Sequence, residues 1–250
     1  MTNIAQLQRL KTAAGERNFC QSWNAWRKDN PEIKINLSKA NLSHLDLRGV
    51  DLKDAYLREV QMTQSDLRSA DFTQANLCYA MLMQANLSQA IIKKTDMTGA
   101  CLKEADLSKA DLSESNLTEA YLTRAYMIKA YLLDAELVLA DLREVDLRGS
   151  RLRKADFTKA NLRDARLSMA NLSRTNLTGA DLTRACLVGA QMRKANLSFS
   201  NLTETDLRNA YLSKANLSDA NLKKAKFSNA YFVGANLSGT LILPVKKDCL

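Results

Sequence analysis

The sequence is short of the residues and segments that several protein classes require. Glycine occurs 8 times and proline twice in 250 residues, so turns rich in these residues can account for little of the chain. No run of about 18 apolar residues could span a bilayer, and membrane insertion is not expected. The first residues, MTNIAQLQRLKTAAGERN, lack the apolar core of a secretory signal. We therefore expect a cytoplasmic protein.

Cysteine and histidine offer little for catalysis or metal binding. The five cysteines are odd in number and form no CxxC pair: Cys20, Cys78, Cys101, Cys186 and Cys249. They indicate reduced thiols rather than a disulfide framework or a zinc site. Histidine occurs once, as His44, and there is no Gly-rich phosphate loop. Because a nucleophile usually needs a base beside it, we expect no enzyme, and neither a cofactor nor a metal.

Acidic residues are fewer than basic ones. The chain has 36 Lys and Arg against 27 Asp and Glu, a formal net charge of +9. Such a charge keeps a protein soluble and favours anionic partners, but it does not specify one.

A repeat of five residues runs through most of the chain. From Leu37 to Ile242, all 42 residues whose numbers end in 2 or 7 are Leu, Met, Phe or Ile, and 32 of them are Leu. Two residues earlier stands Ala, Ser or Thr in 37 of the 42 units. The residue between is most often Asp or Asn, as in ADLSKADLSESNLTEA (105–120). A period of five fits neither a helix nor a strand, so it predicts a solenoid.

The unit explains how such a solenoid would form. Four pentapeptides can close a square coil with four large residues at its centre and the small residue where the chain bends inward. Coils would stack at the spacing of neighbouring strands, about 4.8 Å, and about ten coils would make a rod roughly 50 Å long. Acidic pairs such as Asp106 and Asp111 recur at the structural position of each unit. We therefore expect them to bond to the backbone rather than to act as acid and base.

This pattern resembles that of the pentapeptide-repeat family. The resemblance covers residues 35–242 and implies an all-β solenoid, a right-handed quadrilateral β-helix of about ten coils. It is specific for the fold and not for a function, because most of the family has no established activity. Members similar to this chain are abundant in cyanobacteria, and WNAWRKDNPEIKINLSKANL (23–42) resembles a lead-in common among them.

The two ends of the chain lie outside the repeat. Apolar residues at helical spacing in 1–34 predict two short helices that cap the first coil, with a docking site for a partner as the alternative. Phe227 and Phe232 enlarge the last full coil. The repeat reaches Ile242, Pro244 in LILPV (241–245) prevents its continuation, and residues 243–250 are expected to form a C-terminal tail. Similar family members often dimerise through this end, which implies a homodimer.

One coil has an unusually apolar outer surface. Its candidate partner-binding residues, here called the apolar girdle, are Tyr121, Tyr126, Ile128, Tyr131, Leu133, Val138 and Leu139. Exposed apolar surface often marks an interface, and Tyr is common there. The alternative is that these residues stack on a β surface and only stabilise it.

Cations spaced twenty residues apart should align on successive coils. The basic ladder is Lys154, Arg174, Lys194 and Lys214, with Arg151, Arg153 and Arg193 beside it. The next column, 156, 176, 196 and 216, contains one acid, Asp156. Such a stripe could bind phosphate groups or an acidic protein. The alternative is a solvated face whose side chains extend into water.

These surfaces leave three functions open. The first is a non-catalytic scaffold or regulator that binds an unidentified protein partner. The second is a binder of polyanions such as the nucleic-acid backbone. The third, implied only by the family, is a DNA mimic that binds type II topoisomerases. Such mimicry needs an acidic surface, which a net charge of +9 disfavours.

Overall fold

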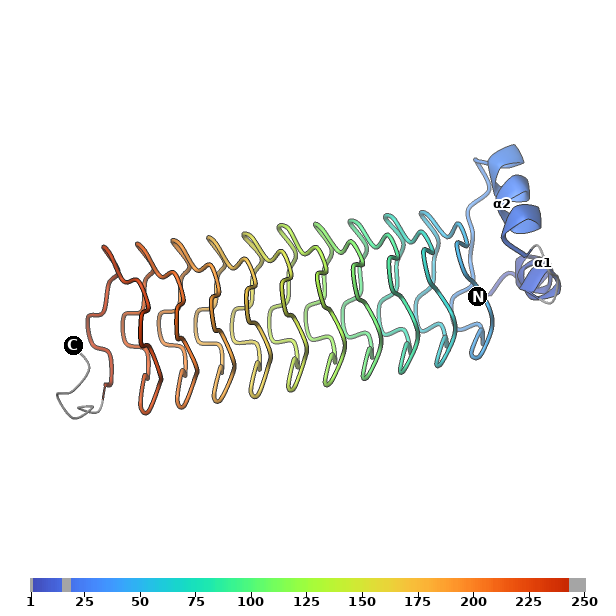
Figure 1. Cartoon of the computed structure of the whole chain (residues 1–250). Coiled ribbons are helices and arrows are strands. Elements are labelled where there is room, and N and C mark those ends of the chain that lie inside the picture. Colours follow the sequence, from blue (N-terminus) through green and yellow to red (C-terminus); the bar gives the residue numbers. More distant parts are fainter. Residues whose placement is uncertain (1, 15–18, 243–250) are drawn as a thin grey trace.

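The protein is a straight rod of stacked coils with two helices at its N-terminal end (Figure 1). The computed structural model describes residues 2–14 and 19–242. Helix α1 spans Ile4–Ala14 and helix α2 spans Phe19–Asp29. The predicted tail at 243–250 lies outside the described residues.

Each coil contains four pentapeptides and pairs with the next coil in parallel. Single-residue bridges join one residue of each pentapeptide, those whose numbers end in 1 or 6, to the residue twenty positions later, from Asn36 with Tyr56 to Asn221 with Leu241. The backbone N–H of Leu37 donates to the carbonyl of Tyr56 (2.9 Å), and the N–H of Tyr56 donates to the carbonyl of Ile35 (2.9 Å). The predicted solenoid, a right-handed quadrilateral β-helix, is confirmed. Residues twenty apart therefore form a column along the rod.

The core is the stack of large and small inward residues. Leu132 and the small Ala130 are fully buried, as are the larger Phe72 and Phe157. At some small positions a Ser or Thr replaces Ala, and the buried hydroxyl bonds to a backbone carbonyl. This carbonyl lies three residues back, as for Ser65 and Met62 (2.6 Å), or in the preceding coil, as for Thr95 and Phe72 (2.7 Å). This bond offsets the cost of burying a polar group.

The corners depend on a left-handed backbone conformation. In each unit the residue before the small position has a positive φ, as Lys39 does at 62° in the turn closed by Ala40 N–H and the Leu37 carbonyl (3.0 Å). All 41 such positions from Lys39 to Gly239 share this conformation, and 34 of them are not glycine. None is Val, Ile or Thr, the residues that tolerate it least. The chain therefore makes its turns without many glycines.

The two helices cover the open edge of the first coil. Trp23 is fully buried, and its indole N–H donates to the carbonyl of Asp51 (2.8 Å). Asn24 bonds to both the Gly49 carbonyl (2.9 Å) and the Asp51 N–H (2.9 Å). Gln6 accepts from the N–H of Asn36 (2.8 Å). These side chains replace the missing preceding coil and satisfy backbone groups that would otherwise have no protein partner.

The other end of the described solenoid is more open. Phe227 and Phe232 are only partly buried and meet edge to face, with ring centroids 6.3 Å apart. Leu237 and Ile242, at core positions of the last coil, are 39% and 44% exposed. Burial of the large residues thus decreases over the last described coil.

Candidate interaction surfaces

The Asp and Asn of the repeat are structural, as expected. The carboxylate of Asp106 accepts the backbone N–H of Ser108 (2.8 Å), and Asp111 accepts that of Ser113 (3.1 Å). The same bond recurs along the rod. These side chains stabilise the turn that follows each bridge residue, because their oxygen atoms accept a backbone N–H there.

Cys78, Cys101 and Cys186 do not come together with His44, and Cys249 lies outside the described residues. His44 is exposed at a corner of the first coil, and Cys78, Cys101 and Cys186 lie on different columns as free thiols. Burial and the neighbouring Asp96 carboxylate raise the pKa of Cys78 to about 11, so this thiol stays protonated at neutral pH. Within 2–14 and 19–242, His, Cys, Asp and Glu form no group of three or more that could hold a metal ion.

The apolar girdle encircles the rod. Tyr121 lies on one side, Tyr126 and Ile128 on the next, Tyr131 and Leu133 on the third, and Val138 and Leu139 on the fourth. The Tyr residues, Leu133 and Leu139 are between 37% and 53% exposed, whereas Ile128 and Val138 are half-buried. A partner that approaches from one side can therefore contact only part of the girdle.

The basic ladder forms one exposed corner of the rod. Lys154, Arg174, Lys194 and Lys214 are all exposed and occupy one column. Lys154 has an acidic neighbour in the preceding coil, Asp134 (3.4 Å), which the sequence argument did not consider. Among the described residues, no acidic side chain forms an ion pair with the other three cations of the ladder or with the flanking arginines.

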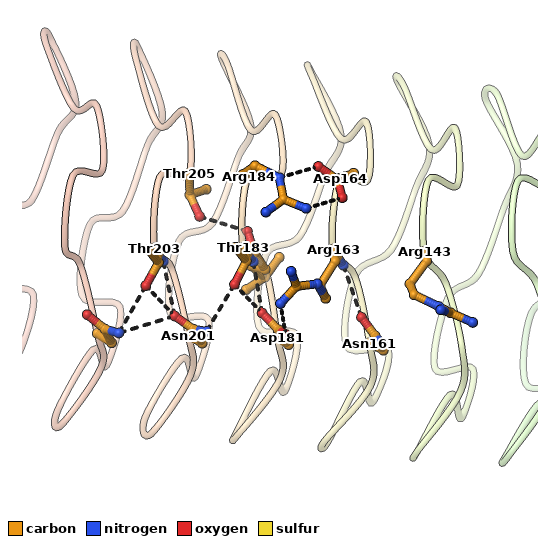
Figure 2. A network of polar contacts seen from close by, with 12 residues as sticks. Arg143, Asn161, Arg163, Asp164, Asp181, Thr183, Arg184, Asn201, Thr203 and Thr205 are labelled. Atoms are coloured by element: carbon orange, nitrogen blue, oxygen red, sulfur yellow. Dashed lines mark hydrogen bonds and ion pairs between the residues drawn. The ribbon is translucent and has the colours of Figure 1, made fainter.

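The diagonally opposite corner shows what a neutralised column looks like. There, from Arg124 to Lys224, acids and bases share one column in equal number and pair between adjacent coils: Arg124 with Glu144 (2.9 Å), Arg184 with Asp164 (2.7 Å) and Lys224 with Glu204 (3.2 Å). Figure 2 shows the Arg184–Asp164 pair, with Arg163 and Asp181 paired on the adjacent side. Arg184 also holds the pKa of Asp164 below its usual value through its hydrogen bond. The same backbone geometry thus neutralises one corner and leaves the other basic.

From 156 to 216, the column beyond the ladder contains one acid, Asp156, and otherwise uncharged asparagines. Its asparagines bond along the column, with Asn216 donating to Asn196 (3.1 Å) and Asn196 donating to Thr178 (2.8 Å). Its one acid in this stretch, Asp156, accepts bonds from Thr158 (2.5 Å) and from the amide of Asn176 (3.3 Å). The ladder therefore lies beside amides that are already partnered.

The girdle and the ladder meet on one side of the rod. The guanidinium of Arg151 lies 4.8 Å from the ring centre of Tyr131. Tyr131, Leu133, Arg151 and Arg153 line a shallow groove of about 520 Å³, together with Met169. Met169 is 69% exposed. It was not predicted as part of this surface, although an apolar residue at an outward position of the repeat could have indicated it.

Comparison with curated proteins finds no match. Among solved structures, HetL, a pentapeptide repeat protein involved in heterocyst differentiation regulation in the cyanobacterium Nostoc sp. strain PCC 7120, is 28% identical. That match covers 100% of both chains with a TM-score of 0.51. A pentapeptide repeat protein of the Arabidopsis thaliana thylakoid lumen is 31% identical over 40% of this chain and 72% of its own, with a TM-score of 0.38. Full-length QnrB1, a plasmid-mediated fluoroquinolone resistance protein, is 16% identical over 84% of this chain and 91% of its own, with a TM-score of 0.32.

A family model described as pentapeptide repeats matches the chain in 8 copies. The matched residues are 35–74, 70–108, 105–143, 140–179, 160–198 and 200–239, which together span most of the solenoid. The chain belongs to the family of pentapeptide repeats.

Proposed function

We propose that this protein is a non-catalytic regulator that acts in the cytoplasm by binding a partner protein. The observation that carries this proposal is the surface where Tyr131 and Leu133 meet Arg151 and Arg153, beside the basic ladder. Exposed aromatic and arginine side chains in one patch are the composition typical of protein interfaces.

Three further observations support the proposal. HetL, which matches over the whole chain, is described as involved in heterocyst differentiation regulation, and this supports a regulatory role. The free thiols of Cys78, Cys101 and Cys186 are typical of a reducing compartment. Neither helix in the described part of the chain is long and apolar enough to cross a membrane.

The test compares partners captured by the wild type and by Tyr131→Glu/Leu133→Glu from a lysate of the source organism. Both side chains are exposed, so the double variant should fold with an unchanged circular dichroism spectrum. We expect a partner that the wild type captures and the variant loses. Tyr121→Glu/Leu139→Glu, on other sides of the same coil, is the matched control and should keep it. Identical capture by all three proteins would contradict the role of this surface.

A second candidate is a binder of polyanions, which the three unpaired cations of the ladder, Arg174, Lys194 and Lys214, favour. Binding of this kind weakens steeply as salt releases counterions. The test is a salt titration with a labelled DNA duplex, in which Arg174→Glu/Lys194→Glu should abolish binding. If the wild type does not bind DNA even at low salt, the polyanion function is ruled out and the protein-binding function is the one that is left.

A further inference from the structure

The basic side of the rod also indicates the shape of the partner. We infer that the ladder binds an acidic α-helix of the partner protein, lying parallel to the rod axis. This inference rests on the proposed function and adds the partner's chemistry and its direction. Three observations carry it: the spacing of the four cations, the lack of an ion pair at Arg174, Lys194 and Lys214, and the aromatic residues at both ends of the ladder.

The spacing of the ladder matches that of a helix. Neighbouring coils are about 4.8 Å apart, so Lys154 and Lys214 are separated by about 14 Å along the rod. A helix rises about 1.5 Å per residue, so residues i, i+3, i+7 and i+10 share one face and span about 15 Å. Four acidic residues at these positions would each face one cation, with an offset of about 1 Å at most.

Other polyanions fit this spacing less well. In an extended peptide, side chains on one face recur every 6.8 Å or so, which places about three carboxylates along the ladder. Along about 14 Å of B-form DNA a strand passes about four base pairs, over a third of a turn, and curves away from a flat side. A helix lying along the rod therefore gives the ladder the largest number of aligned opposite charges.

Among the described corner positions, only this corner carries a run of four successive cations. Contacts such as Arg124 with Glu144 show that side chains at corner positions of adjacent coils reach one another. Arg174, Lys194 and Lys214 are therefore neighbouring like charges, and no acid on the described chain pairs with them. Arg153 and Arg193 add charge on the same side and can bind carboxylates through two N–H groups.

Aromatic residues stand at both ends of the ladder. Tyr131 and Leu133 lie one coil before Arg151 and Arg153. Tyr211 lies on the coil of Lys214 and stacks on Tyr231, with ring centroids 5.1 Å apart and the planes at 2°. These rings are between 37% and 53% exposed, so they can receive apolar residues placed one turn beyond the acidic stretch of the helix.

The test measures binding of synthetic peptides to the full-length protein by fluorescence anisotropy in low salt. The probe is an Ala-rich peptide with Glu at i, i+3, i+7 and i+10 and a Leu one turn beyond each end, its helicity checked by circular dichroism. The comparison peptide has the same composition, with its four Glu spread around the helix. We expect the first peptide to bind at least about tenfold more tightly than the second, equivalent to about 1.4 kcal/mol.

The protein variants show where the peptide binds. Arg174→Glu/Lys194→Glu should abolish the preference, whereas Lys109→Glu/Lys159→Glu should keep binding within about threefold. All four residues occupy the left-handed corner position, where Glu104 and Glu114 already occur, and both variants lower the net charge equally. Tyr131→Ser/Leu133→Ser should weaken binding of the Leu-containing peptide and leave its salt dependence unchanged.

Each other outcome overturns the inference in a recognisable way. Equal binding of the two peptides would mean that the ladder attracts negative charge without selecting a helix. Tighter binding of a DNA duplex would assign the ladder to a nucleic-acid backbone. No binding of either peptide would remove the helical partner, while a partner lost by Tyr131→Glu/Leu133→Glu would still support the proposed function.

Discussion

Truncation of a core leucine should cost very different amounts in the middle and at the end of the rod. Leu132 is 0% exposed and Leu237 is 39% exposed, although both occupy the same position of the repeat. Leu→Ala at 132 removes apolar atoms worth about 2.4 kcal/mol of transfer free energy and leaves a cavity that raises the loss to about 3–5 kcal/mol. At 237 only about three-fifths of the transfer term applies and no closed cavity forms, so the loss should be about 1–1.5 kcal/mol.

The assay is urea unfolding followed by far-ultraviolet circular dichroism, with linear extrapolation of the free energy of unfolding. Leu132→Ala and Leu237→Ala are compared with the wild type at one protein concentration. Equal losses for the two variants would refute the reasoning, because burial in the structure would then not determine the contribution of a core residue.

Four further results are expected. Lys109→Val should lower the free energy of unfolding by about 1–2 kcal/mol in urea titrations, because a β-branched residue is strained at positive φ, whereas Lys109→Gly should stay within about 1 kcal/mol of the wild type. Trp23→Ala should cost about 3–5 kcal/mol in the same assay, since it removes a buried ring and leaves an edge carbonyl unpaired. The hydrogen bond from Arg143 lowers the pKa of Asp141 in the folded state. The stability that this bond contributes is therefore complete above the pKa of Asp141 in the unfolded chain, and it is lost as the pH falls through its pKa in the folded protein. The urea concentration at the unfolding midpoint should therefore decrease when the pH is lowered below about 4, and it should decrease less in Asp141→Asn. If the protein dimerises through its C-terminal end, light scattering should give twice the chain mass for the wild type and the chain mass for Phe232→Glu, and a monomeric wild type would rule this contact out.

Much of the fold follows from the periodicity, because one rule decides the burial of every residue in the repeat. Once Leu132 is assigned to the core, the outward positions of Tyr131 and Leu133 follow from their place in the unit. The left-handed corners were not predicted, although their signal was present in the absence of Val, Ile and Thr at those positions. The period of the repeat indicates which side chains point inward. The left-handed backbone conformation of the corners is indicated only by the residue types that are absent from those positions.

The candidate surfaces could be predicted only as columns. The alignment of Arg174 with Lys194 follows from the coil length, which the repeat specifies. The pairing of Lys154 with Asp134 and the position of Arg151 over Tyr131 depend on which way long side chains turn, and no spacing in the sequence determines that. The helical cap likewise was predicted from the spacing of its apolar residues, but its hydrogen bonds to the edge of the first coil are visible only in the structure.

The coil of twenty residues also determines how this surface can change in evolution. Duplication of a whole coil lengthens the rod and leaves every column intact. Insertion of a single pentapeptide keeps the core pattern but moves every later outward residue to the next side of the rod. One such insertion after residue 160 would separate Lys154 from the other three cations of the ladder without altering a buried side chain. A family built this way can exchange binding surfaces by small duplications, with little effect on the sequence rule that folds the protein.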